Sequence, residues 1–198
     1  MRDKKIFYVH ERKTLAFLMG TVYHSHIRNA RPNFKSFFGG FFTMIYHSTR
    51  NEQLTASSTH AVLQGIAPDG GLYICDPAAL RFDWRAALEK DTLSMAADIL
   101  HALLPDFQDM DRLVRDSYAG KFPTSDLTPL TPVADKYVLE LYHGPTSAFK
   151  DVALSVLPRL IVAAAKAEGM KGDVVILTAT SGDTGKAAME GFHDVPGT

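Results

Sequence analysis

The stretch Tyr142–Asp151 reads YHGPTSAFKD, and Thr180–Gly185 reads TSGDTG further along the chain. The first stretch places Lys150 at the start of an expected helix, and the second places a glycine-rich turn at the start of the next helix. An apolar run at 173–178, between the two helices, is typical of a parallel strand covered on both faces. With a further strand expected at 136–141, the order strand, helix, strand, helix predicts an open α/β sheet. Both motifs then lie at carboxyl ends of strands, where such sheets bind ligands.

The glycine-rich turn has the composition of an anion site. Gly182 and Gly185 allow a ligand to approach the backbone, and the unpaired N–H groups of a helix start favour negative charge. Ser181 and Thr184 would add hydroxyl groups. A tight turn capped by Ser181 or Asp183, with no ligand, is an equally open interpretation of this motif alone.

Lys150 is ambiguous when it is taken by itself. A lysine in the first helical turn faces the helix dipole unfavourably, although a surface lysine paired with Asp151 stays open. As a neutral amine in a dry pocket, it could form a Schiff base with an aldehyde cofactor. One crossover helix separates it from the glycine-rich turn, so both should face the same crevice. A nucleotide-binding P-loop is excluded because Thr180 stands where its first glycine is needed and Ala187 where Ser or Thr is needed.

Before these motifs, residues 44–123 have the pattern of a small α+β domain that ends near Phe122–Pro123. Caps and turn residues divide it into short elements without clustered catalytic side chains. After it, 128–132 is expected to be a restrained connector. We expect strands at 45–49 and 72–74, helices from Ser57 or Ser58 to Gln64 and after Asp83, Ser94, and Asp109 or Asp111, then helices at 149–168, kinked at Pro158, and 183–191.

The overall composition is that of a globular protein. Of 198 residues, 46% are hydrophobic, and the net charge of −1 gives no general attraction to nucleic acid or membrane. The single cysteine, Cys75, excludes an internal disulfide, fits a reducing, cytoplasmic setting, and is expected to be a packing residue. No apolar run is long enough for a transmembrane helix.

The average conceals a change in composition near Met44. Residues 1–43 contain eight Lys/Arg and two Asp/Glu, a net of +6, whereas the remainder carries −7. They also hold nine of the 20 aromatic residues. This asymmetry predicts an appended segment outside the fold.

Four explanations of the segment 1–43 are open. It could be a basic arm for nucleic acid, an organelle transit peptide, or a signal peptide with the short apolar core Leu15–Met19. We favour the fourth, a translated upstream stretch with the natural start at Met44. His24 and His26 lack further ligands at suitable spacing, so we expect no metal site.

Several motifs together carry a family resemblance. His143–Asp151 resembles the lysine motif of threonine synthases, which use pyridoxal 5′-phosphate (PLP), and Thr180–Gly185 is similar to the substrate-carboxylate loop of fold-type-II PLP enzymes. Tyr46–Arg50, Gly65–Leu72 and Thr128–Leu130 resemble the N-terminal domain of the family. The match covers essentially all of the chain from Met44 onward.

The resemblance implies a fold, a reaction and a set of site residues. The fold would be α/β, with 44–123 as the N-terminal domain and 124–198 as the start of a tryptophan-synthase-β-like parallel-sheet domain. The reaction would convert O-phospho-L-homoserine and water to L-threonine and phosphate. Lys150 would hold PLP and move protons at Cα and Cβ. The substrate carboxylate would bind Ser181, Gly182, Asp183, Thr184 and Gly185, with Asp183 also near the phenolic edge of PLP.

Departures and rival functions accompany this resemblance. Ser147 stands where an apolar residue is expected, and Pro158 is a second departure. Family members continue beyond Thr198, where the groups for the PLP phosphate and ring nitrogen would lie, so a truncated chain that is inactive alone is expected. The alternatives are another fold-type-II lyase, such as a serine/threonine dehydratase or cysteine synthase, and a non-catalytic fragment or basic-armed binding module.

Overall fold

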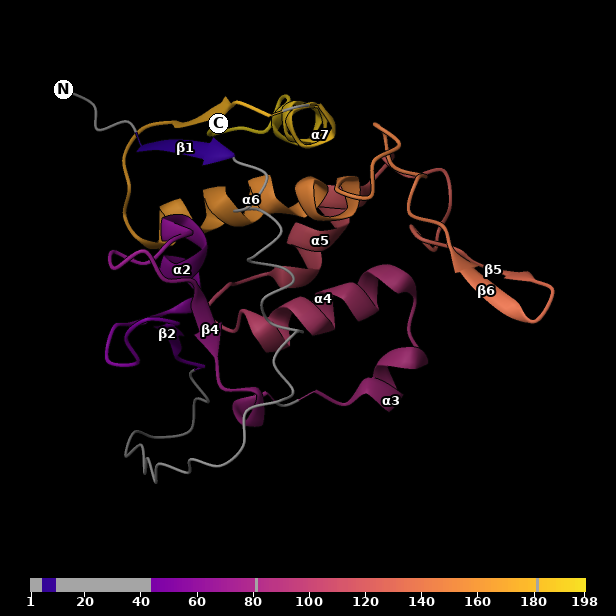
Figure 1. Cartoon of the computed structure of the whole chain (residues 1–198), viewed down its shortest axis with the longest axis horizontal. Helices are drawn as coiled ribbons and strands as arrows, with labels where there is room; N and C mark the ends of the chain where they lie inside the picture. The colour runs from indigo at the N-terminus through magenta and orange to yellow at the C-terminus, as the bar shows by residue number, and fades with distance from the viewer. Residues whose placement is uncertain (1–4, 10–43, 81, 181) are drawn as a thin grey trace.

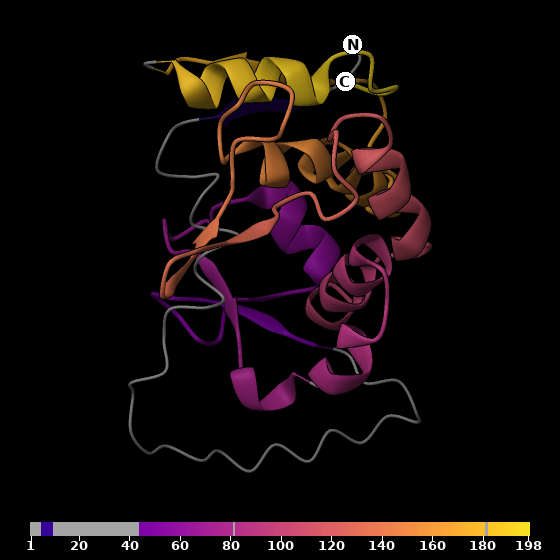
Figure 2. The same ribbon diagram turned by 90° about the vertical axis from the view of Figure 1, so that its right-hand side faces the viewer.

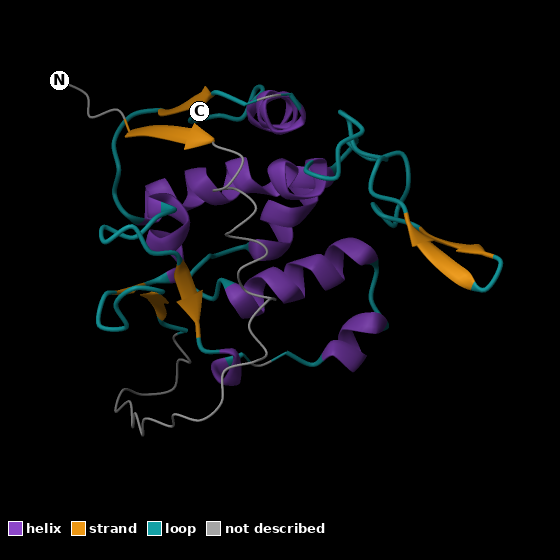
Figure 3. Ribbon diagram, in the orientation of Figure 1, coloured by secondary structure: helices purple, strands orange, loops and turns teal. Residues whose placement is uncertain are grey.

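The computed structural model describes residues 5–9, 44–80, 82–180 and 182–198. These ranges contain helices and short strands, and the strands form three small sheets (Figure 3). The helices are α2 (Ser58–Gln64), α3 (Trp84–Leu88), α4 (Thr92–Leu103), α5 (Met110–Tyr118), α6 (Asp151–Ala167) and α7 (Asp183–Phe192), with a 3₁₀ turn over Pro77–Ala79. The strands are β1 (Lys5–Val9), β2 (Tyr46–Ser48), β3 (Thr55–Ala56), β4 (Tyr73–Cys75), β5 (Leu130–Val133), β6 (Lys136–Leu139) and β7 (Val174–Thr178).

The first part of the chain folds around a three-stranded antiparallel sheet in the order β3-β2-β4. Helix α2 begins as predicted, because the Ser57 side chain accepts a hydrogen bond from the His60 N–H at 3.1 Å. It ends at Gly65, whose φ of 72° is readily adopted only by glycine. These local caps explain why this region could be read from sequence.

A buried polar network joins β2 to the turn before β4. The Ser48 hydroxyl, which is fully buried, donates to Asp69 Oδ1 at 2.8 Å and accepts from the Arg50 N–H at 3.1 Å. The Gly71 N–H donates to Asp69 Oδ1 at 2.9 Å. A Cβ on Gly71 would lie 2.0 Å from Ser48 Oγ, so this turn requires glycine.

Asp69 should make the stability of the chain depend on pH. The Gly71 N–H and the Ser48 hydroxyl hold the pKa of Asp69 below its ordinary value. Because the folded pKa is depressed, this contribution to stability is present above the unfolded pKa of about 3.9 and is lost as pH falls through the folded pKa. In urea unfolding between about pH 6 and pH 3, Asp69→Asn should lose less stability on acidification than the wild type. If the free energy of unfolding fell equally with pH in the two proteins, the depressed pKa of Asp69 would be contradicted.

Helix α4 corrects one predicted cap. The sequence predicts Ser94 as the cap of this helix, but the helix starts at Thr92, and Asp91 accepts from the backbone N–H groups of Leu93 and Ser94 at 3.1 and 3.0 Å. The Ser94 hydroxyl donates to Asp91 Oδ2. The carboxylate can accept several donors at once, so it takes the cap position, three residues before Ser94.

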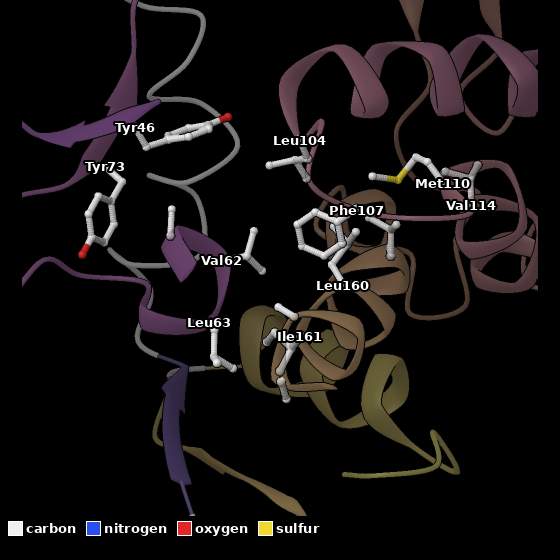
Figure 4. Packing of buried hydrophobic residues seen from close by; sticks show 14 of the residues in the cluster. Tyr46, Val62, Leu63, Tyr73, Leu104, Phe107, Met110, Val114, Leu160 and Ile161 are labelled. Atoms are coloured by element: carbon white, nitrogen blue, oxygen red, sulfur yellow. The ribbon is translucent and has the colours of Figure 1, made fainter. Parts of the chain in front are cut away.

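The main apolar core runs across the predicted domain boundary (Figure 4). Tyr46, Val62, Phe107 and Val114 belong to the same buried cluster as Leu160 of α6. The cluster also takes in residues of β7 and α7. The boundary near 123 therefore stays a prediction, and the packing on its two sides is continuous.

Helices α6 and α7 approach each other backbone to backbone, with α7 lying across α6 (Figure 2). Pro158 lies inside α6 and has no N–H, so the Leu154 carbonyl loses its usual helical donor. Gly191 of α7 packs on that carbonyl, since a Cβ at Gly191 would lie 2.1 Å from Leu154 O. A proline in one helix and a glycine in the other thus allow the contact.

In the second part of the chain, the structure differs from the predicted sheet. Residues 128–132 were expected to be a connector and 136–141 a strand of the α/β sheet. Instead β5 and β6 pair antiparallel in a hairpin that projects from the body (Figure 1), with Leu130 59% and Tyr137 71% exposed. The two-residue turn was missed because Ala134, at φ 54°, lacks the usual turn chemistry of Gly or Asn.

Strand β7 pairs with β1 rather than with β6. The register is parallel and runs from Lys5 opposite Val174 to Val9 opposite Thr178. Lys5–Val9, which belong to the segment 1–43 expected outside the fold, therefore pair with β7. The rest of that segment, including His24, His26 and the stretch 15–19, lies outside the described residues. The described fold is mixed α/β, with two small antiparallel sheets and the parallel pair β1–β7. No described helix is long and apolar enough to cross a membrane.

Candidate active site

The loop that carries Lys150 is anchored at the base of the hairpin. Glu140 follows β6 and accepts from the Thr131 hydroxyl at 2.7 Å, and its other oxygen contacts His143 Nε2. These two hydrogen bonds lower the pKa of Glu140. Because Thr131 belongs to β5, Glu140 connects the hairpin to the start of the loop.

Lys150 lies where the sequence predicted, at the mouth of α6. It is the residue before the helix, and its carbonyl accepts from the Leu154 N–H at 2.8 Å, which fixes its backbone. The side chain is half-buried rather than enclosed in a dry pocket, and its Nζ lies 4.4 Å from the centroid of the Phe149 ring. Phe149 is itself 45% exposed, so the amine stands at an accessible rim.

Asp151 faces into the loop rather than toward Lys150. It is 2% exposed, and it accepts from the Thr146 N–H at 2.8 Å and from the Thr146 hydroxyl at 2.6 Å. A Cβ on Gly144 would lie 2.4 Å from Asp151 Cβ. The pairing of Lys150 with Asp151 that sequence left open is therefore not the arrangement in this part of the structure.

The glycine-rich turn is held by a threonine that sequence analysis did not single out. Gly182 precedes α7 with φ 152°, and the Gly185 N–H donates to Thr180 Oγ1 at 2.7 Å. A Cβ on Gly185 would lie 2.6 Å from that oxygen. Thr180, rather than Asp183, therefore closes this turn by a side-chain hydrogen bond.

The remaining predicted residues of the turn have different surroundings. Asp183 is exposed and is the first residue of α7. Thr184 is 1% exposed, and its hydroxyl is enclosed without a hydrogen-bond partner among the described residues. Ser181 lies outside the described residues.

Lys186 joins the two motifs. Its Nζ donates to the Thr146 carbonyl at 3.3 Å, so the first turn of α7 reaches the loop before Lys150. The close packing of α6 on α7 supports the same juxtaposition. The sequence motifs did not indicate a role for Thr146 or Lys186, and for Asp151 they offered only a pairing with Lys150. The spacing of Thr146 and Asp151 across the start of a helix was the available signal.

A recess of about 560 Å³ lies elsewhere, between α5 and α6. Three carboxylates and three cationic side chains line it, so it has no net charge to select an ion. None of the predicted site residues belongs to its lining. It is therefore separate from the two motifs.

Comparison with known proteins identifies relatives that match about three quarters of this chain. Residues 45–131 match the family model "Threonine synthase N terminus". The chain is 38% identical to threonine synthase of Saccharomyces cerevisiae over 171 residues, which are 76% of this chain and 33% of that protein. It is 36% identical to the Pseudomonas aeruginosa threonine synthase over 155 residues, 75% of this chain and 32% of that protein.

Solved structures agree with these relatives. The PLP-bound threonine synthase of Brucella melitensis is similar with a TM-score of 0.66 and 36% identity, over 76% of this chain and 33% of that one. Threonine synthase of Escherichia coli gives a TM-score of 0.64 and 31% identity, over 78% of this chain and 35% of that one. The chain thus spans about one third of the length of the relatives it matches. It belongs to the threonine synthase family, of which it represents the N-terminal portion.

Proposed function

We propose that this chain supplies the lysine and carboxylate-binding parts of a PLP-dependent threonine synthase site. The observation that carries the proposal is the hydrogen bond from Lys186 to Thr146, because it brings the Lys150 loop and the glycine-rich turn together. The reaction would convert O-phospho-L-homoserine and water to L-threonine and phosphate. The finer fold that accompanies this proposal is the beginning of a tryptophan-synthase-β-like domain at 124–198.

The residues present fit PLP and its amino-acid substrate. Lys150 offers a half-buried, accessible primary amine, the group that reacts with an aldehyde. At the start of α7, the N–H groups of Asp183 and Thr184 have no intrahelical acceptor, because the first N–H groups of any helix lack one. The Gly185 N–H is already taken by Thr180. The turn therefore keeps part of its donor set for a carboxylate.

Each residue then has a defined task. When bound, PLP supplies an electron sink for the substrate carbon. Lys150 would hold the aldehyde and, once displaced by the substrate amine, carry protons at Cα and Cβ. Ser181, Gly182, Asp183 and Thr184 would orient the substrate carboxylate by backbone N–H groups and the helix dipole. Gly185, whose N–H is bonded to Thr180, would let the carboxylate approach the backbone, and Asp183 would also lie near the phenolic edge of PLP.

Chemical trapping tests this assignment. After incubation with PLP and reduction by borohydride, peptide mass mapping should place the label on Lys150, and Lys150→Ala should abolish it. Lys166→Ala is the matched control, because Lys166 is an exposed lysine at the other end of α6 and its loss should change nothing. Labels on other lysines, with none on Lys150, would refute the assignment.

Competition tests the substrate. O-phospho-L-homoserine should lower trapping at Lys150, because its amine competes for the aldehyde once its carboxylate is held by the turn. L-serine at the same concentration should compete less. Equal competition by the two amino acids would favour the alternative fold-type-II lyases over threonine synthase.

A further inference from the structure

The loop before α6 holds one residue in an unfavourable conformation. Ser147 has φ 60°, in the left-handed region that side chains other than glycine rarely adopt. Its N–H donates to the Gly144 carbonyl at 3.0 Å, which closes the turn three residues before Lys150. Such strain persists only where the surrounding contacts over-determine the backbone.

Asp151 supplies those contacts on one side. Both of its carboxylate oxygens are used on a single residue, Thr146, and its own N–H donates to the Ala148 carbonyl at 2.9 Å. Ser147 is thus bracketed by two residues that Asp151 binds. Thr146 is in turn held at its N–H, its hydroxyl and its carbonyl, the last by Lys186.

Burial makes the Asp151 contacts strong and local. A carboxylate that is 2% exposed keeps a large desolvation penalty unless hydrogen-bond donors reach it. Here both donors come from the loop, so displacing Thr146 would leave the buried carboxylate unsatisfied. Gly144 lies so close to Asp151 that any side chain at position 144 would clash with the Asp151 side chain.

We propose that Asp151 is a positioning residue that locks the strained loop and thereby presents Lys150 at the mouth of α6. The inference rests on the proposed function in one respect, namely that Lys150 is presented in order to react with the cofactor. The locking itself is a property of the chain without cofactor. Asp151 touches neither the lysine amine nor any reacting atom in this assignment; it acts through Thr146.

The decisive variants change one hydrogen bond at a time. Thr146→Val removes the hydroxyl donor and keeps the shape of the side chain, whereas Thr146→Ser keeps the hydroxyl and removes a methyl group. Asp151→Asn keeps the size of the group and removes its charge. Losing a hydrogen bond to a charged group should raise the local opening of the loop about tenfold or more.

Two readouts separate positioning from general stability. In the cofactor-free chain, amide hydrogen exchange of the loop 144–149 should accelerate about tenfold in Thr146→Val and Asp151→Asn, but not in Thr146→Ser. The rate of PLP trapping at Lys150 should fall in the same two variants. Exchange in α4 and α5 should stay at the wild-type rate in all three.

The outcomes distinguish the two proposals. Unchanged exchange in Thr146→Val and Asp151→Asn, or acceleration spread equally over α4 and α5, would overturn the positioning role. If the wild type takes no label at Lys150 while loop exchange follows the expected order, the proposed function fails and the lock stands. If Asp151→Asn does not fold, Thr146→Val against Thr146→Ser decides the question alone.

Discussion

Gly191→Ala should destabilise the chain by about 3 kcal/mol. An alanine in place of glycine inside a helix normally stabilises it by about 1 kcal/mol, so the expected sign is the reverse of helix propensity. The reason is the position of the new Cβ, 2.1 Å from the Leu154 carbonyl oxygen. This oxygen belongs to the backbone of a buried helix, so it cannot rotate away, and α7 must move off α6.

Urea unfolding followed by circular dichroism measures this effect. Met189→Ala, two residues earlier in α7, is the control, because Met189 is 67% exposed and its truncation should cost little. A Gly191→Ala protein as stable as the wild type would mean that α6 and α7 do not touch along this line. The juxtaposition of the Lys150 loop with the glycine-rich turn would then lose the support of helix packing and rest on the Lys186–Thr146 hydrogen bond alone.

Leu160→Ala should cost about 3 kcal/mol, within the usual range for removing a fully buried leucine. Leu160 is 2% exposed and packs in the cluster that joins α6 to α2, α4 and α5. Since the core is continuous, the loss should be felt in both parts of the chain. Leu88→Ala, at a 63% exposed helical position, provides the same chemical change with little expected effect.

The same variant tests the predicted domain boundary near 123. We expect one urea transition, with hydrogen exchange in α2 and in α6 accelerated by similar factors. A second transition, or acceleration confined to α6, would contradict a shared core and would favour two independent domains. Circular dichroism and exchange of the two helices give the answer together.

The sequence predicted those elements whose ends are set by contacts between residues close together in the chain. Ser57 and Gly65 mark the ends of α2 through bonds within a few residues, and the apolar run after Lys150 predicted the start of α6 to within two residues. The hairpin was missed because its turn residue, Ala134, adopts a positive φ without a typical turn side chain. The partner of β7 was missed because parallel pairing with β1 joins residues far apart in the chain.

The candidate site shows the same division. Lys150 and the glycine-rich turn were predicted from short motifs, and the membership of the chain in the threonine synthase family is confirmed. The contacts of Thr146 with Asp151 and Lys186 depend on how α6 and α7 pack. That packing rests in turn on Pro158 and Gly191, a pair that no local pattern connects. The roles assigned to individual site residues stay predictions.

The buried thiol of Cys75 allows local opening of the sheet to be measured by its rate of chemical modification. It is the only thiol in the sequence, it is 7% exposed in β4, and burial raises its pKa. Because only an exposed thiolate reacts with a disulfide reagent, modification must wait until the sheet around Tyr46 opens. The rate of that single reaction therefore reports how readily the β2–β4 sheet opens, in the chain without any mutation.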